Sequence, residues 1–187
     1  MPSSRAIPLL LLLTAAAACS DSATAPGPIA LPVQFAHEAN HRLTPLSGNE
    51  EVPVRSTPAS GQALFHVALD GRTIAYQLFV RDIRNVFQAH IHLAPAGQNG
   101  GIVVWLYPST APAPGPLGAG PVEGQIAQGA ITEANLVGAL AGQPLSSLVE
   151  AMRAGNAYVN VHTNDGVPPA DTGPGDFPGG EIRGQIP

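Results

Sequence analysis

The 187-residue sequence predicts an all-β domain, either a sandwich or a barrel, from three observations. Short apolar segments with period-two alternation follow one another from about residue 43 to the C-terminus. The chain holds 21 glycines and 20 prolines, which indicates many turns. Strands do not alternate with long helical patterns, and this argues against a parallel α/β sheet.

The clearest strands form an expected hairpin. Residues 65–69 and 74–80 alternate in hydropathy on either side of Asp70-Gly71, a dipeptide typical of tight hairpin turns. The same reasoning predicts further strands at 86–93, 102–107, 122–131, 157–163 and 181–186.

Residues 132–155 depart from the β pattern and predict short helices. Thr132 is a suitable cap for the first of them. The second begins after Pro144 and ends at Gly155, positions where helices accept these residues. Its apolar residues recur at helical spacing: Leu145, Leu148, Val149 and Met152. We expect both helices to lie in one crossover between strands.

Residues 1–18 are expected to be a removable export signal. Arg5 precedes an apolar run that is too short to cross a bilayer as a helix, which needs about 20 residues. Small residues then lead to Cys19, the only cysteine, in a pattern that resembles a bacterial lipobox. Ser20 after the cysteine resembles outer-membrane lipoproteins. We therefore expect an extracytoplasmic protein anchored to the outer membrane by a lipid on Cys19; the alternative is a secreted or periplasmic protein cleaved near Ala18.

Residues 19–42 are small and proline-containing, and we expect a flexible tether that leads from the membrane to a domain at 43–187. With one cysteine, the domain must fold without an internal disulfide. The formal net charge is −5 and no lysine is present. The sequence therefore has no basic stripe and does not predict a nucleic-acid partner.

Polar residues on three predicted strands form a candidate site. His90 and His92 lie two residues apart and share one strand face, and His162 and Glu181 lie on the polar faces of later strands. If these strands are neighbours, three imidazoles and a carboxylate converge, a set that suits one ion of zinc, copper or iron. The alternative is a structural network of hydrogen bonds in which Arg183 pairs with an acid such as Glu181.

Nothing in the motifs predicts a reaction. No G-x-S-x-G nucleophile elbow and no phosphate-binding glycine loop is present. Trp105 and Tyr107 share a strand face, and we expect them to pack in the core; the alternative is that they stack on a carbohydrate. The sequence thus favours a non-catalytic binding module that meets a ligand of the cell envelope or its surroundings, with metal binding as the alternative function.

Several strings resemble the CHRD domain, first described in chordin and widespread in bacterial exported proteins. They occur in family order: LSGNEEVP, LDGRTIAYQLFV, AHIHLAPAGQNGGIVVWL, AGNAYVNVHT and PGGEIRGQI. The resemblance implies an immunoglobulin-like or superoxide-dismutase-like antiparallel β-sandwich and points to interaction rather than catalysis.

A looser similarity links the H-x-H pair and the Gly/Asn-rich turn after it to copper–zinc superoxide dismutase. It implies a ligand role for His162 on a late strand. Residues 93–161 contain no histidine, so the bridging imidazole of a second metal is lacking and a mononuclear site is expected.

Overall fold

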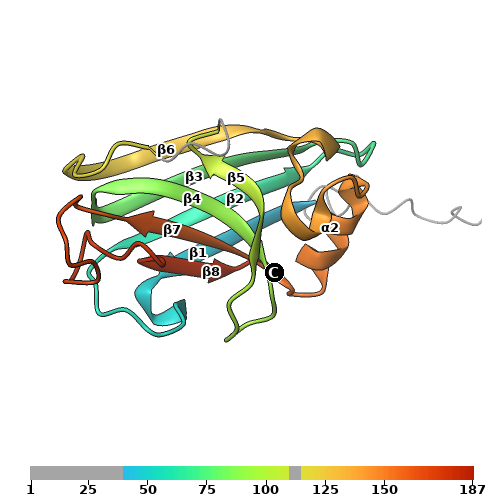
Figure 1. Cartoon of the computed structure of the whole chain (residues 1–187). Helices are drawn as coiled ribbons and strands as arrows, with labels where there is room; N and C mark the ends of the chain where they lie inside the picture. Colours follow the sequence, from blue (N-terminus) through green and yellow to red (C-terminus); the bar gives the residue numbers. More distant parts are fainter. Residues whose placement is uncertain (1–39, 110–114) are drawn as a thin grey trace, which may run out of the picture. The chain divides into compact units, whose positions relative to one another are not determined.

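The computed structural model describes residues 40–109 and 115–187, which form eight β-strands, one α-helix and three short 3₁₀ helices (Figure 1). In chain order these are β1 (His41–Ser47), η1 (Gly48–Glu50), β2 (Ser60–Val67), β3 (Ile74–Arg84), β4 (Val86–Leu93), β5 (Gly101–Tyr107), β6 (Pro121–Ile131), η2 (Glu133–Asn135), η3 (Gly138–Leu140), α2 (Leu145–Arg153), β7 (Ala157–Thr163) and β8 (Ile182–Gln185).

All strands pair in antiparallel fashion in the order β5-β4-β7-β8-β1-β2-β3-β6. Two four-stranded halves meet where β8 joins β1 through a single register pair, Ser47 with Arg183. The outermost strands β5 and β6 are also in contact, so the sheet curls back on itself (Figure 1). The all-β antiparallel prediction is confirmed, and the two halves belong to one continuous sheet.

The apolar core lies between the two halves. Side chains alternate along the strands, so every second residue of β2 and β3 faces inward, as Phe65, Ile74 and Leu78 do. From the other half, Ile91 and Val159 are fully buried against the same core. Burial of each large apolar side chain contributes about 1.5–3 kcal/mol, and the fold is held by this core because no disulfide is available.

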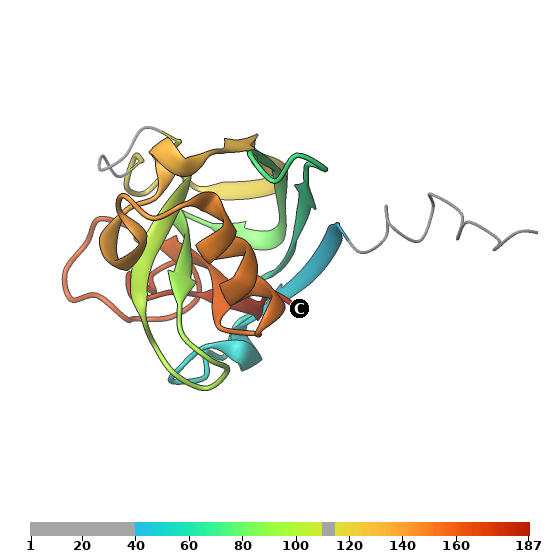
Figure 2. The same cartoon turned by 90° about the vertical axis from the view of Figure 1, so that its right-hand side faces the viewer.

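The predicted helix is confirmed as α2, which lies across one end of the curled sheet (Figures 1 and 2). Its buried stripe is the one expected from the sequence: Leu145, Leu148, Val149 and Met152. Pro144 occupies the cap position and Gly155 has a φ of +67°, a left-handed conformation that glycine adopts without strain. Thr132 caps η2, also as expected.

The β2–β3 hairpin is confirmed, with Val67 opposite Ile74. Asp70 Oδ1 accepts a hydrogen bond of 2.9 Å from the Arg72 amide, and Gly71 takes a φ of +68°. Strand β1 was not predicted, because Pro45 interrupts its pattern; it begins at His41, two residues before the expected domain boundary.

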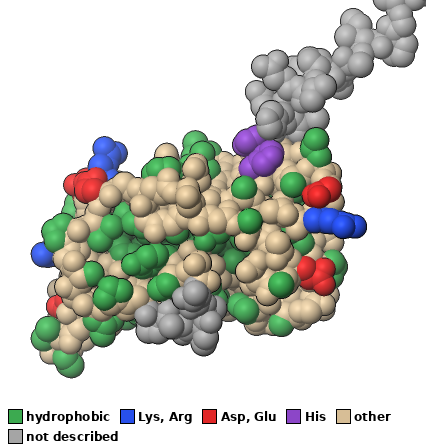
Figure 3. Space-filling view, turned by 90° about the horizontal axis from the view of Figure 1, so that it is seen from above, with side chains coloured by type: hydrophobic (Ala, Val, Ile, Leu, Met, Phe, Trp, Pro, Cys, Tyr) green, Lys and Arg blue, Asp and Glu red, His purple; other side chains and the backbone are tan. Residues whose placement is uncertain are grey.

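The predicted signal, Cys19 and nearly all of the predicted tether lie outside the described residues. In the described part of the chain, none of the helices has the length and hydropathy needed to cross a membrane. On the face seen in Figure 3, charged side chains lie mainly toward the two ends, and apolar and uncharged polar side chains fill the middle.

Candidate functional site

Strands β4, β7 and β8 are adjacent, as the site hypothesis required. The register places His90 opposite Asn160, which in turn lies opposite Arg183. His92 lies opposite Tyr158 one row away. These side chains share the face of the sheet that points away from the core, so the pleat alone brings them together.

The imidazoles of His90, His92 and His162 form a compact cluster, in which one nitrogen from each lies within 4.8 Å of the others. His90 Nδ1 and His162 Nε2 are 3.1 Å apart. Two nitrogens bound tetrahedrally to one zinc ion, each at 2.0–2.1 Å, would be about 3.3 Å apart. This pair therefore already has the spacing of two ligands on a common metal ion.

Backbone carbonyls fix the proton on two of the three rings. His92 Nδ1 donates to Gly100 O and His162 Nδ1 donates to Pro178 O, each at 2.9 Å. A carbonyl can only accept, so in each neutral ring Nε2 carries the free lone pair. A carbonyl partner on the second nitrogen is the usual arrangement around metal-bound histidine.

His90 completes the cluster by donating from Nδ1 to His162 Nε2. The Nε2 atoms of His90 and His92 are buried and have no hydrogen-bond partner among the described residues. A buried polar atom without a partner costs about 1–3 kcal/mol. At His92, the lone pair of Nε2 therefore has no partner, and a group that accepts an electron pair, such as a metal ion, would provide one.

All three rings are neutral near pH 7. His90 is 0 % exposed, His92 8 % and His162 7 %. Burial lowers the pKa of His90 to about 3, with a further contribution from the neighbouring His162 and His92. Burial also lowers the pKa of His162 to about 4 and that of His92 below its ordinary value. Neutral imidazoles are the form that binds metals.

Glu181, the fourth residue of the predicted set, is not part of this cluster. Its Oε2 accepts hydrogen bonds from Thr163 Oγ1 at 2.6 Å and from the Gly175 amide at 2.8 Å, and its Oε1 accepts one from Thr57 Oγ1. The residue precedes β8, so its carboxylate is directed into the surrounding loops rather than along the face of the strand. Glu181 ties these loops to β7.

Aromatic rings surround the cluster. Trp105 meets His90 edge to face, with ring centroids 4.3 Å apart, and Tyr158 stacks on His92 at 4.9 Å with an interplanar angle of 10°. The guanidinium of Arg183 lies 3.4 Å from the centroid of the Tyr158 ring. Arg183 therefore packs on Tyr158 rather than pairing with Glu181.

The expected core position of Trp105 is wrong, whereas Tyr107 does pack against the core. The pairing of β4 with β5 shifts register between Ala89 and His90 and again between Ile91 and His92. These irregularities break the period-two alternation, so the sequence pattern did not place Trp105 beside His90.

Glu51 and Asn160 form a second buried polar pair on the same face, which the sequence reasoning missed. Asn160 Nδ2 donates to both carboxylate oxygens of Glu51, at 2.8 and 3.1 Å. Burial raises the pKa of Glu51 to about 7, although Arg183 and Arg55 act in the opposite direction. Glu51 comes from the LSGNEEVP string, whose family resemblance was the only signal that could have indicated it.

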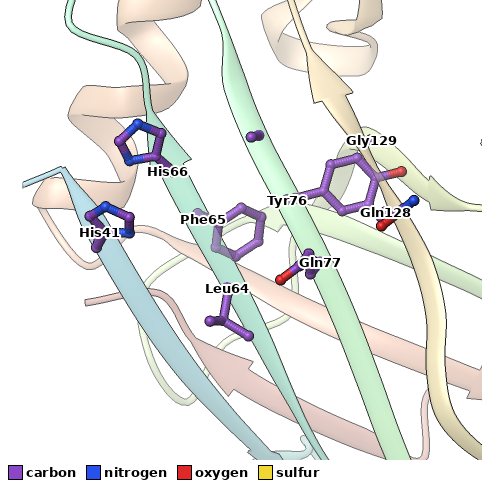
Figure 4. Close-up of a pocket in the computed structure, with 9 residues that line it drawn as sticks. His41, Leu64, Phe65, His66, Tyr76, Gln77, Gln128 and Gly129 are labelled. Carbon is purple, nitrogen blue, oxygen red and sulfur yellow. The ribbon is translucent and has the colours of Figure 1, made fainter.

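A separate pocket of about 490 Å³ lies on the outer face of the other half of the sheet (Figure 4). His41 and His66 lie beside each other there, with ring centroids 4.3 Å apart. His66 thus lies apart from the cluster of His90, His92 and His162.

Comparison with known proteins gives one family. The profile described as "CHRD domain" matches residues 43–186. A search of curated proteins and a search of solved structures each found no match. The match covers the whole of the curled sheet except for the first two residues of β1.

Proposed function

The chain belongs to the CHRD domain family, and we propose that its domain is a binding module built around a mononuclear transition-metal centre of His90, His92 and His162. Family membership supports a binding or interaction module. The observation that carries the metal is the geometry of the cluster, in which three neutral, buried imidazoles present one nitrogen each within 4.8 Å.

The donor set selects the metal. Three imidazoles without a thiolate suit zinc, copper or iron, whereas calcium and magnesium require oxygen ligands. His92 Nε2, His162 Nε2 and His90 Nδ1 would hold the ion, with His90 in the tautomer that carries its proton on Nε2. Three protein ligands leave one coordination position open.

A purely structural histidine network is the competing explanation. Such a network would satisfy its buried nitrogens internally, yet His90 Nε2 and His92 Nε2 lack partners in the described part of the chain. The carbonyl partners of His92 Nδ1 and His162 Nδ1 suit either explanation, and they leave Nε2 of both rings as the atom with a lone pair, as in metal-bound histidine.

We further propose that the domain acts outside the cytoplasm, held at the outer membrane by a lipid on Cys19. The proposal rests on the sequence pattern that ends at Cys19. Labelling of cells with a radioactive fatty acid tests it. We expect label on the full chain and none on Cys19→Ser; label on neither would leave a secreted protein.

Metal binding is tested on untagged protein. The only tryptophan, Trp105, has its ring 4.3 Å from His90, so Cu(II) at the cluster must quench its fluorescence. We expect one copper or zinc per chain by elemental analysis, with quenching that saturates at one equivalent. His92→Gln and His162→Gln should lose binding by at least 100-fold, and His66→Gln, in the separate pocket, is the matched control.

Thermal melting of each variant establishes that it is folded. Equal metal content and quenching in wild type, His92→Gln and His162→Gln would contradict the centre. Metal bound to wild type and lost equally from His66→Gln would place the metal elsewhere.

A further inference from the structure

We infer that the outer face of the β1–β2–β3–β6 half of the sheet, which we call the open face, binds a neutral polysaccharide. This surface is separate from the histidine cluster, so the inference goes beyond the proposed metal centre. Four features of the open face carry it: two hollows along the same strands, the absence of charge around them, amide side chains that are open to partners, and strand edges that are already paired.

Two hollows lie along the same strands of the open face. The first is the pocket of about 490 Å³ beside His66 and Gln77 (Figure 4). The second, of about 400 Å³, lies beside Gln62 and Phe79. His66 and Gln62 are four residues apart on β2, which at about 3.3 Å per residue is about 13 Å. A ligand that occupies both hollows must therefore be elongated.

The outward residues around the two hollows include no acid and no arginine until Arg81, at the far end of the second hollow. They form three cross-strand rows: His41, His66, Ala75 and Ala130; Leu43, Leu64, Gln77 and Gln128; Pro45, Gln62, Phe79 and Gln125. A charged polymer is recognised through opposite charges on its partner, and these rows offer no acid or arginine to provide them. The open face therefore suits an uncharged ligand.

Amide side chains supply polar groups in the middle of the open face. Gln62 and Gln77 are exposed and make no side-chain hydrogen bond within the described residues. An amide both donates and accepts hydrogen bonds, as a sugar hydroxyl does. Leu64 and Phe79 are half-buried beside these amides and offer apolar contact to the C–H groups of a sugar ring. An elongated, uncharged ligand with many hydroxyl groups is a neutral polysaccharide.

Two other occupants fit the open face less well. An extended peptide that adds a strand needs a free strand edge, but β2 and β3 are paired on both edges. A second copy of the chain, packed face to face, would bury the amides of Gln62 and Gln77, and a buried amide that lacks a partner destabilises the interface. A polysaccharide brings hydroxyl partners to the same amides.

Native electrophoresis of the full-length protein through gels that contain a soluble polysaccharide tests the inference. The neutral probes are hydroxyethyl cellulose, dextran and galactomannan, and alginate is the acidic probe. We expect at least one neutral probe to retard the protein and alginate to leave its mobility unchanged. Gln77→Ala should weaken binding to that neutral probe about 10-fold, because it removes an amide that bonds to the sugar. Gln98→Ala, the same change on an exposed loop of the other half, should leave the affinity unchanged.

Retardation by none of the neutral probes, or equal affinity of Gln77→Ala and Gln98→Ala, overturns the inference. His92→Gln should bind the polysaccharide as wild type does, so the fate of the metal centre and that of the open face are decided separately. Sedimentation velocity without polysaccharide tests the second copy. We expect a monomer; a dimer that Gln77→Glu dissociates would assign the open face to self-association and overturn the inference. Gln77 is exposed, so its variants should fold.

Discussion

In both halves of the sheet, successive side chains alternate between the core and the outer face. The outer face of one half is buried under loops, whereas the outer face of the other half is exposed to solvent. On the β4–β7–β8 half, the outward residues His90, Asn160 and Arg183 are 0 %, 3 % and 1 % exposed. On the β1–β2–β3–β6 half, outward residues remain open to solvent, as Leu43 does at 57 %. The alternation thus determines on which side of a strand a residue lies, and the loops determine whether that side is exposed to solvent.

Loop contacts produce the difference. Residues 48–59, 94–100 and 164–181 lie over the β4–β7–β8 face and are fastened to it by polar bonds. Asn99 accepts from Arg183 and Pro178 O accepts from His162. Each bond anchors a loop and also orients a residue of the site, so the cover and the site form one structure.

Acidification should produce the largest difference between the two faces, because the buried histidines of the β4–β7–β8 face make the free energy of unfolding depend on pH. The native pKa values of His90 and His162, about 3 and about 4, lie below the ordinary 6.5, and that of His92 is also lowered. Their contribution to stability is complete above pH 6.5 and is lost as the pH falls toward 4, because the unfolded chain then binds protons that the native chain does not.

Glu51 acts in the opposite sense, because its native pKa of about 7 lies above the ordinary 4.5. His90 and His162 together outweigh Glu51, so between pH 6.5 and 4.5 unfolding takes up about one proton net or more, and the free energy of unfolding of metal-free protein should fall by about 1.4 kcal/mol per pH unit or more. Urea denaturation at a series of pH values measures this slope. A flat or rising stability on acidification would show that the three rings are not buried as neutral groups.

Glu181→Ala should give the largest effect of a single substitution on the covered face. The change leaves the donors of Thr57, Thr163 and Gly175 without their acceptor, and we expect a loss of about 3–5 kcal/mol in the free energy of unfolding. Glu123→Ala on the exposed edge strand β6 is the matched control and should change stability by less than about 0.5 kcal/mol. Similar values for the two variants would refute the anchoring role of Glu181.

Asn160→Ala should cost less, about 1–3 kcal/mol, because it removes the two hydrogen bonds to Glu51 from a single amide. Gln77→Ala, on the open face of β3, should be within about 0.5 kcal/mol of wild type. Chemical denaturation of both variants at pH 7 and pH 5 sharpens the comparison. The loss of stability caused by Asn160→Ala should be smaller at pH 5, because Glu51 is then protonated in both the wild type and the variant.

The sequence was most informative where local rules decide the structure. Hydropathy period predicted the β2–β3 hairpin and α2, and the two-residue spacing of His90 and His92 placed both on one face. His162 joined them because β7 is the neighbour of β4, a pairing that the sequence raised only as a condition. The histidine cluster could thus be predicted up to the choice of strand neighbours.

The remainder depends on non-local structure. Because of two register shifts in the β4–β5 pair, Trp105 lies on the same face as the histidines. No residue type in these strands predicts such shifts. Glu181 was misassigned because it was counted as part of a strand that begins at Ile182. Glu51 reaches the face from a loop 109 residues away from Asn160 in sequence, a contact that local patterns do not encode.

The single register pair between Ser47 and Arg183 has a consequence for biosynthesis. The pair joins strands from opposite ends of the domain, so it cannot form during synthesis until Arg183 has been added to the chain. Pro178, whose carbonyl orients His162, lies in the segment that leads to β8. An emerging chain therefore has neither the last wall of the site nor the correct ring orientation. A metal ion at the proposed centre would therefore find its complete site only after this last segment has folded, and the ions available in the compartment where folding is completed would decide which metal is bound.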